Sequence, residues 1–267
     1  MIRVGALLGK ELADLSRNRS ILFPAMMTGA ISMLLPFFIA ILVPYFSGER
    51  LSDSADFQVA IEMYRDQPAT RNLGPEAAVQ TWIFQQFLML LVMTPIAGAM
   101  SIAAYAVIGE KQARTLEPLL ATPISTVELL TAKVLGALIP AVAISIGCFA
   151  VYVVLIAIFA DPGVARVMLT GRSLAIVFAL GPLAALAALQ LAVCVSSRVN
   201  DSRSAQQIGA LIILPVTGLF VAQISGNVVM TARLIATISI GLVVVNIFLM
   251  RVGVALFDRE AILTRWK

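Results

Sequence analysis

Six long windows without a charged residue restrict the fold of this chain more than any other feature of the sequence. Each window has about the length, roughly 20 residues, that crosses a hydrocarbon core of about 30 Å. Backbone amides find no water in that core, so each window must form an α-helix. We therefore expect six transmembrane helices, at residues 21–45, 82–109, 134–160, 173–195, 205–223 and 234–250.

The composition excludes a water-soluble domain. Hydrophobic residues make up 60% of the 267 residues and charged residues 13%, whereas soluble domains contain roughly 45–50% apolar and about 25% charged residues. All nineteen Lys and Arg residues and all fifteen acidic residues fall outside the six windows. The sequence thus predicts one all-α transmembrane domain over residues 1–267.

The distribution of basic residues predicts the orientation, because Lys and Arg accumulate in cytoplasmic loops. If both termini are cytoplasmic, thirteen basic residues are inside: Arg3, Lys10, Arg17, Arg19, Lys111, Arg114, Lys133, Arg198, Arg203, Arg251, Arg259, Arg265 and Lys267. Six are then outside: Arg50, Arg65, Arg71, Arg166, Arg172 and Arg233. We therefore expect cytoplasmic termini, an outer loop at 46–81, a cytoplasmic loop at 110–133 and a cytoplasmic tail at 251–267.

Residues 1–20 have the pattern of an amphipathic helix. Val4, Leu7, Leu8 and Leu15 share one helical face, and basic residues such as Lys10 occupy the other. A helix of this kind lies in the membrane interface with its apolar face toward the acyl chains. We expect an interfacial helix before the first span.

Several kinds of chemistry lack the residues that they need. The chain has no histidine, and no acidic residue lies within a window, so imidazole catalysis and intramembrane carboxylate relays have no candidates. The segment GALLGKE at residues 5–11 has the wrong spacing for a phosphate-binding loop. No basic cluster interleaved with aromatic residues indicates nucleic-acid binding. We expect no catalytic residue, no metal site and no ATP hydrolysis by this chain alone.

Polar side chains within the windows include Gln85, Gln86, Gln190 and Asn246. They could line a polar path through an ATP-independent carrier or channel. They could equally form hydrogen bonds between helices, each worth roughly 0.5–2 kcal/mol.

The loop between the second and third windows is polar and contains two prolines. Ser125 and Glu128 have the spacing of a capping box, which predicts a helix that starts near Ser125 and continues into the third span. Before it, Pro118 suits the first turn of a short helix that Pro123 ends. Such a helix could dock into a groove on a partner protein or lie against lipid headgroups.

This loop resembles a known family signature. Residues 110–123, EKQARTLEPLLATP, resemble the pattern E-x-x-x-G-T-L-E-x-L-L-x-x-P of the type-2 ATP-binding-cassette permeases, the membrane subunits of exporter-type transporters. Arg114 stands where the family more often has glycine. The segments GKELADLSRNRSILF at 9–23, STVELLTAKVLGALIP at 125–140 and LFDREAILTRWK at 256–267 also resemble the family.

The resemblance implies a permease subunit in the inner membrane of a prokaryote, which exports a substrate and forms a dimer with a second permease, a copy of itself. ATP and magnesium would bind to separate ATPase subunits, and this chain would carry no cofactor. The polar loop would be the coupling helix that rests on the ATPase. The coupling residues implied are Glu110, Thr115, Leu116, Glu117, Pro118, Leu119, Leu120 and Pro123.

Overall fold

Helices make up all the regular structure of the part of the chain that the computed structural model describes. These residues are 22–58, 61–62, 70–112, 126–196, 207 and 210–256, together with the single residues 5, 8, 9 and 13. No strand occurs among them. Five stretches are long and apolar enough to cross a membrane: Phe23–Ser47, Pro75–Ala103, Val127–Phe159, Gly171–Val195 and Ala232–Leu256. The protein is therefore an all-α, multi-pass membrane protein.

The first span is built from three consecutive segments. Helix α2 (Phe23–Phe37) continues into the π-helical turn η2 (Phe38–Leu42) and then into α3 (Val43–Ser47). Gly48 ends the span in the left-handed region at φ 72°, and its amide donates to the carbonyl of Pro44 at 2.9 Å. A residue without Cβ adopts this conformation without strain, which explains the glycine at this C-terminus.

The loop after the first span holds two short 3₁₀ turns, η3 (Leu51–Asp53) and η4 (Ala55–Phe57). The carboxylate of Glu76 accepts hydrogen bonds from the backbone amides of Leu51 at 3.3 Å and Ser52 at 3.0 Å. Glu76 lies in the first turn of the next helix. The loop is thus attached to the end of the second span.

Two helices are longer than the sequence windows predict. Helix α5 (Pro75–Gln112) begins before the expected start at residue 82, and α7 (Thr126–Phe159) begins before residue 134. The third window starts directly after the charged Lys133, but a helix can continue past the hydrocarbon because its backbone hydrogen bonds are internal. The start of α7 at Thr126 agrees with a helix that begins near Ser125.

The fourth span also changes its helical geometry along its length. After the short helix α8 (Val164–Met168), it consists of α9 (Gly171–Ala175), the π-helical turn η5 (Ile176–Leu180) and α10 (Gly181–Ser196). Pro182 is separated from the end of η5 by Gly181, and Pro36 from the start of η2 by Phe37. The first and fourth spans therefore each contain a π-helical turn close to a proline.

Only part of the fifth predicted span, residues 205–223, lies among the described residues. Its described part is the 3₁₀ turn η6 (Ala210–Ile212) followed by α12 (Ile213–Ile224), which has 12 residues. Twelve α-helical residues cover about 18 Å, less than the hydrocarbon core of about 30 Å. The described residues therefore contain five complete spans, the last being α13 (Ala232–Leu256), and one shorter apolar helix.

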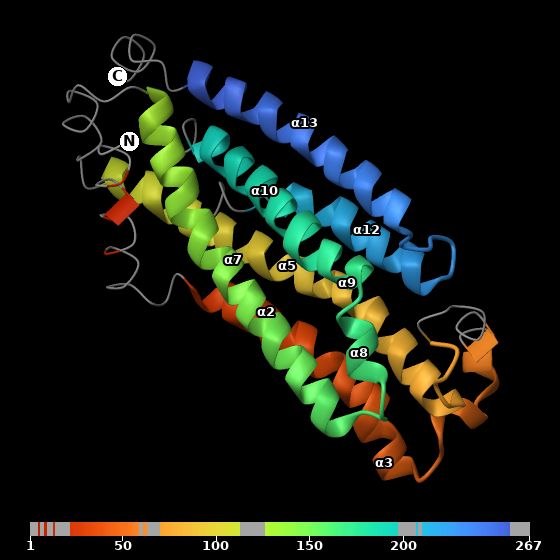
Figure 1. The fold of residues 1–267 in the computed structure, drawn as a ribbon. Coiled ribbons are helices and arrows are strands. Elements are labelled where there is room, and N and C mark those ends of the chain that lie inside the picture. The colour runs from red at the N-terminus through yellow and green to blue at the C-terminus, as the bar shows by residue number, and fades with distance from the viewer. Residues whose placement is uncertain are drawn as a thin grey trace.

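Helix α5 occupies the centre of the bundle (Figure 1). It packs against α2, α7, α10 and α12, whereas α13 packs mainly against α10 at the edge. In the apolar window of α5, 78% of the residues are buried, compared with 11% in that of α13. The spans thus form one central helix and a surrounding layer.

The central packing combines aromatic rings with small residues. The rings of Phe37 and Phe84 lie 4.9 Å apart, and Tyr152 approaches both at 5.8 Å. The Tyr152 hydroxyl donates to the carbonyl of Phe84 at 3.0 Å. Nearer the other end of α5, a Cβ at Gly98 would come within 2.9 Å of the Cβ of Ala25. Glycine therefore allows α2 and α5 to approach closely.

Three predicted segments fall largely outside the described residues. Of the interfacial helix at 1–20, only Gly5, Leu8, Gly9 and Ala13 are described. The segment 113–125 of the predicted coupling loop and residues 257–267 of the predicted tail are not among them. The predictions for these segments remain predictions.

Candidate functional site

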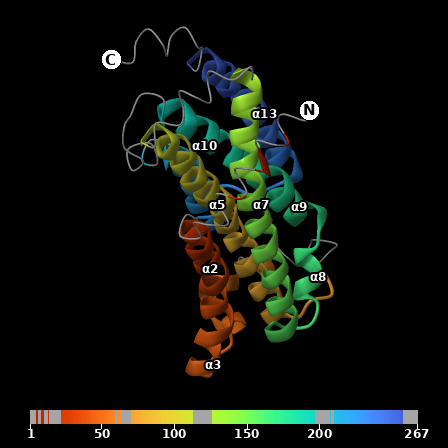
Figure 2. The same ribbon diagram turned by 90° about the vertical axis from the view of Figure 1, so that its left-hand side faces the viewer.

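The two helices that flank the predicted coupling loop both exceed the thickness of a bilayer. Helices α5 and α7 have 38 and 34 residues, which correspond to about 57 Å and 51 Å. A bilayer with its headgroups is about 40–45 Å thick. The end of α5 and the start of α7 lie at the same end of the bundle (Figures 1 and 2). The chain between them therefore connects two helix ends that can extend beyond the membrane.

Among the predicted coupling residues, Glu110 belongs to the end of α5. The other seven lie outside the described residues: Thr115, Leu116, Glu117, Pro118, Leu119, Leu120 and Pro123. Their role in coupling remains a prediction from the sequence.

The four polar residues predicted within spans fall into two separate places. Gln85 and Gln86 lie on α5, whereas Gln190 on α10 and Asn246 on α13 line one groove together. All four are buried. The first pair is hydrogen-bonded to neighbouring segments, and the second pair lines the groove.

Gln86 connects the central helix to the C-terminal end of α12. Its Nε2 donates to the backbone carbonyl of Gln223 at 3.2 Å, and its Oε1 accepts from Nε2 of Gln223. Both residues are buried. These two hydrogen bonds give both polar atoms of the Gln86 side-chain amide a partner, which lipid could not supply. They therefore stabilise the α5–α12 contact.

Two further glutamines of α5 connect it to the segment that leads into α10. Oε1 of Gln85 accepts a hydrogen bond from the guanidinium of Arg172. Oε1 of Gln80 accepts from the backbone amide of Asp161 at 2.8 Å. Gln80, Gln85 and Gln86, with their partners Arg172 and Gln223, form what we call the α5 glutamine cluster. It joins α5 to two neighbouring parts of the bundle.

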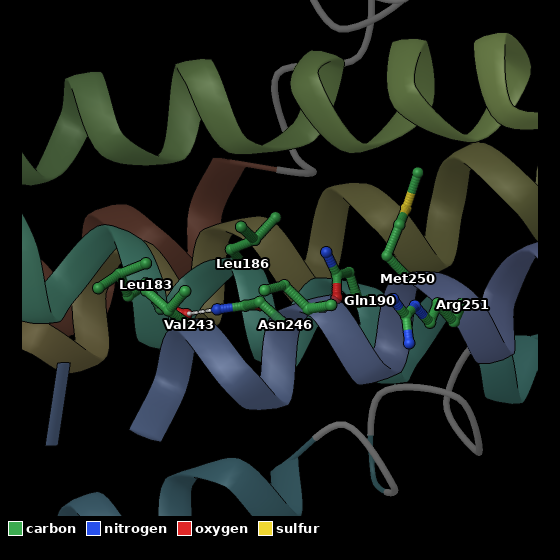
Figure 3. Close-up of a pocket in the computed structure, with 8 residues that line it drawn as sticks. Leu183, Leu186, Gln190, Val243, Asn246, Met250 and Arg251 are labelled. Atoms are coloured by element: carbon green, nitrogen blue, oxygen red, sulfur yellow. Dashed lines mark hydrogen bonds between the residues drawn. The ribbon is translucent and has the colours of Figure 1, made fainter. Parts of the chain in front are cut away.

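Gln190 and Asn246 lie in a groove of about 450 Å³ between α10 and α13 (Figure 3). Nδ2 of Asn246 donates to the backbone carbonyl of Leu183 at 3.1 Å. Arg251 also lines this α10–α13 groove, and the rest of its lining consists of apolar side chains. Its volume lies within the range of roughly 300–1,000 Å³ that is typical of ligand pockets.

Sequence reasoning missed three residues that the structure places in these sites. Gln223 is an amide at the end of the fifth window, and the criterion that selected Gln86 would have selected it too. Arg172 and Arg251 lie just outside windows, and the sequence predicted Arg172 in an outer loop and Arg251 in the cytoplasmic tail. Their proximity to the α5 glutamine cluster and the α10–α13 groove depends on which helix faces meet.

Comparison with protein families identifies a relationship for most of the chain. A family model described as "ABC-2 family transporter protein" matches residues 66–258, which is more than half of the chain. No curated protein matches the chain significantly.

Proposed function

Because the chain belongs to the ABC-2 transporter family, we propose that it is the permease subunit of an ATP-binding-cassette exporter. Permeases of this family generally pair with ATP-binding subunits. This chain would form a dimer with a second copy of itself, and each copy would bind one ATPase subunit. The substrate would cross the membrane between the two bundles.

The observation that carries this proposal is the length of α5 and α7. Both helices exceed the bilayer and their adjoining ends lie together. The segment between them resembles the family signature at residues 110–123, and in this proposal it would reach a soluble partner. Glu110 and Glu117 would meet basic or amide groups of the ATPase, and Leu119 and Leu120 would fill an apolar groove on it.

In this mechanism ATP and magnesium bind to the partner subunits and supply the free energy. Closure of the ATPase pair would push on the coupling segments, and α5 and α7 would carry the movement into the bundle as rigid bodies. The π-helical turns η2 and η5 are the points at which the neighbouring spans could bend, since π-helical turns often occur at functional sites.

The proposal places both termini and residues 110–133 in the cytoplasm of a prokaryote, and residues 46–81 outside its inner membrane. Cysteine labelling tests this orientation. A cysteine at Ala69 should react with an impermeant maleimide in intact cells, and one at Ala121 only after permeabilisation. The reverse pattern would contradict the proposed topology.

Co-purification tests the division of labour. The chain should retain an ATPase subunit encoded beside it, and ATP hydrolysis should appear only in preparations that contain this partner. Sustained hydrolysis by the purified permease alone would contradict the assignment of ATP binding to another chain.

A further inference from the structure

The α10–α13 groove faces the bilayer. Both of its helices are membrane spans, and α13 is the least buried span of the five. Val243 and Ile247, which line the groove, are 42% and 53% exposed. Any occupant therefore comes from the hydrocarbon phase, where an acyl chain matches the apolar lining of Leu183 and Leu186.

Two side-chain oxygens in the groove lack a hydrogen-bond partner among the described residues. They are Oε1 of Gln190 and Oδ1 of Asn246, and each residue is only 6% exposed. An unpaired buried acceptor is unfavourable, and in hydrocarbon water does not replace the missing donor. The two oxygens indicate that the occupant carries a hydrogen-bond donor.

Arg251 adds a positive charge at one end of the groove. Its side chain is exposed and makes no ion pair or hydrogen bond with the rest of the described chain. Figure 3 shows Arg251, Met250 and Gln190 at this end, and Leu183 and Val243 at the other. A cation at the end of an otherwise apolar groove complements an anionic head attached to a chain.

We propose that the α10–α13 groove binds an anionic amphiphile from the bilayer. Its head pairs with Arg251, a donor next to the head hydrogen-bonds to Gln190 and Asn246, and its acyl chain lies along Leu183 and Val243. Met250 is unbranched and can change rotamer, which gives the donor access to the two covered oxygens.

Other parts of this protein fit the groove less well. A second copy that docked through the same face would bring a second Arg251 to the same membrane depth, and like charges repel. The sequence beyond α13 contains Asp258, Arg259 and Glu260, which are costly to place against hydrocarbon. An amphiphile meets the charge, the donor requirement and the apolar lining together.

The proposal goes beyond the proposed transport function, and its test needs only this chain. The full chain would be placed in phosphatidylcholine nanodiscs with N-myristoylglycine that carries a diazirine on its acyl chain. This probe has a carboxylate, an amide donor and an apolar chain. After irradiation, peptide mass spectrometry should find adducts on α10 and α13.

Competition by unlabelled compounds tests each chemical element of the proposed ligand. N-myristoylglycine should compete best. Myristate lacks the donor and N-myristoylethanolamine lacks the charge, so each should compete roughly tenfold less well, as expected for one lost charged or buried hydrogen bond. Inorganic phosphate has no chain and should not compete.

Variants assign these effects to residues of the groove. Arg251→Gln should abolish the advantage of N-myristoylglycine over N-myristoylethanolamine. Gln190→Leu combined with Asn246→Leu should abolish its advantage over myristate, and both proteins should keep their melting temperatures. Val243→Trp should block labelling by filling the groove. Val244→Trp is the matched control, because Val244 is 62% exposed and does not line the groove.

Three results would overturn the proposal. One is equal labelling of the Val243→Trp and Val244→Trp proteins, which would mean that lipids merely cover the surface. Another is adduct formation elsewhere in the chain. The third is a disulfide from a cysteine at Val243 to its counterpart in a second copy, or to a cysteine at Ala261, because the groove would then hold protein.

Discussion

Helices α5 and α13 are both apolar spans, yet their surroundings are nearly opposite. In α5, 78% of the apolar window is buried, and in α13 only 11%. The central helix contains buried amides and hydroxyls such as Gln80, Thr81, Gln86 and Thr94, whereas α13 presents residues such as Phe248 to the lipid. The comparison shows that hydrophobicity identifies a span but does not distinguish the helix that others surround from one at the edge.

The largest difference between the two helices should appear on truncation of an aromatic side chain. Phe84→Ala removes a fully buried ring that contacts Phe37 and Tyr152, and the cavity should lower the unfolding free energy by roughly 3 kcal/mol. Phe248→Ala on α13 removes a ring that is 63% exposed and should have almost no effect. Thermal unfolding of both variants in the same detergent measures the difference, and equal losses would contradict the central place of α5.

A smaller contrast is expected when glycine is replaced by alanine in each helix. In Gly98→Ala the new Cβ would approach Ala25 at 2.9 Å and Ala141 at 3.2 Å, and such overpacking costs about 1–3 kcal/mol. Gly241→Ala on α13 meets nothing within 4 Å and should be neutral or slightly stabilising, because alanine favours helix. The same unfolding experiment tests this pair, and a destabilised Gly241→Ala protein would show that α13 packs against a further surface.

The smallest contrast concerns the amides. Gln86→Leu leaves Nε2 of Gln223 without its acceptor, which should cost about 1–2 kcal/mol. Asn246→Leu removes one hydrogen bond but also an unpartnered oxygen, so its effect should stay within about 0.6 kcal/mol. Thermal unfolding of both variants measures this difference. If Asn246→Leu lowers the unfolding free energy more than Gln86→Leu does, the hydrogen bond of Asn246 is the stronger polar contact and the account is wrong.

Much of this fold could be predicted because the bilayer reduces the choice of structure to the helix. The all-α, multi-pass architecture follows from uncharged windows, and the match to the ABC-2 family confirms the resemblance found at residues 110–123. Helix ends were less predictable. The third window began directly after Lys133, whereas α7 begins at Thr126. Helix α5 begins at Pro75, where the carboxylate of Glu76 bonds to the neighbouring loop.

The partners of the polar residues could not be predicted, because they depend on which helix faces meet. The sequence identifies Gln85 and Gln86 as exceptional but does not indicate that Arg172 and Gln223 bind them. The π-helical turns near Pro36 and Pro182 likewise reflect local geometry that composition does not specify.

The most direct test of the account combines Glu117→Lys with Leu120→Asp in the predicted coupling segment. The first change places like charges against the ATPase, and the second removes apolar contact worth roughly 1.5–3 kcal/mol, so affinity should fall tenfold or more. Neither residue lies within a predicted span. The account predicts a protein that inserts and elutes normally from a sizing column but does not retain its ATPase subunit. Full retention of the ATPase together with normal transport would contradict the claim that this segment couples the permease to its energy source.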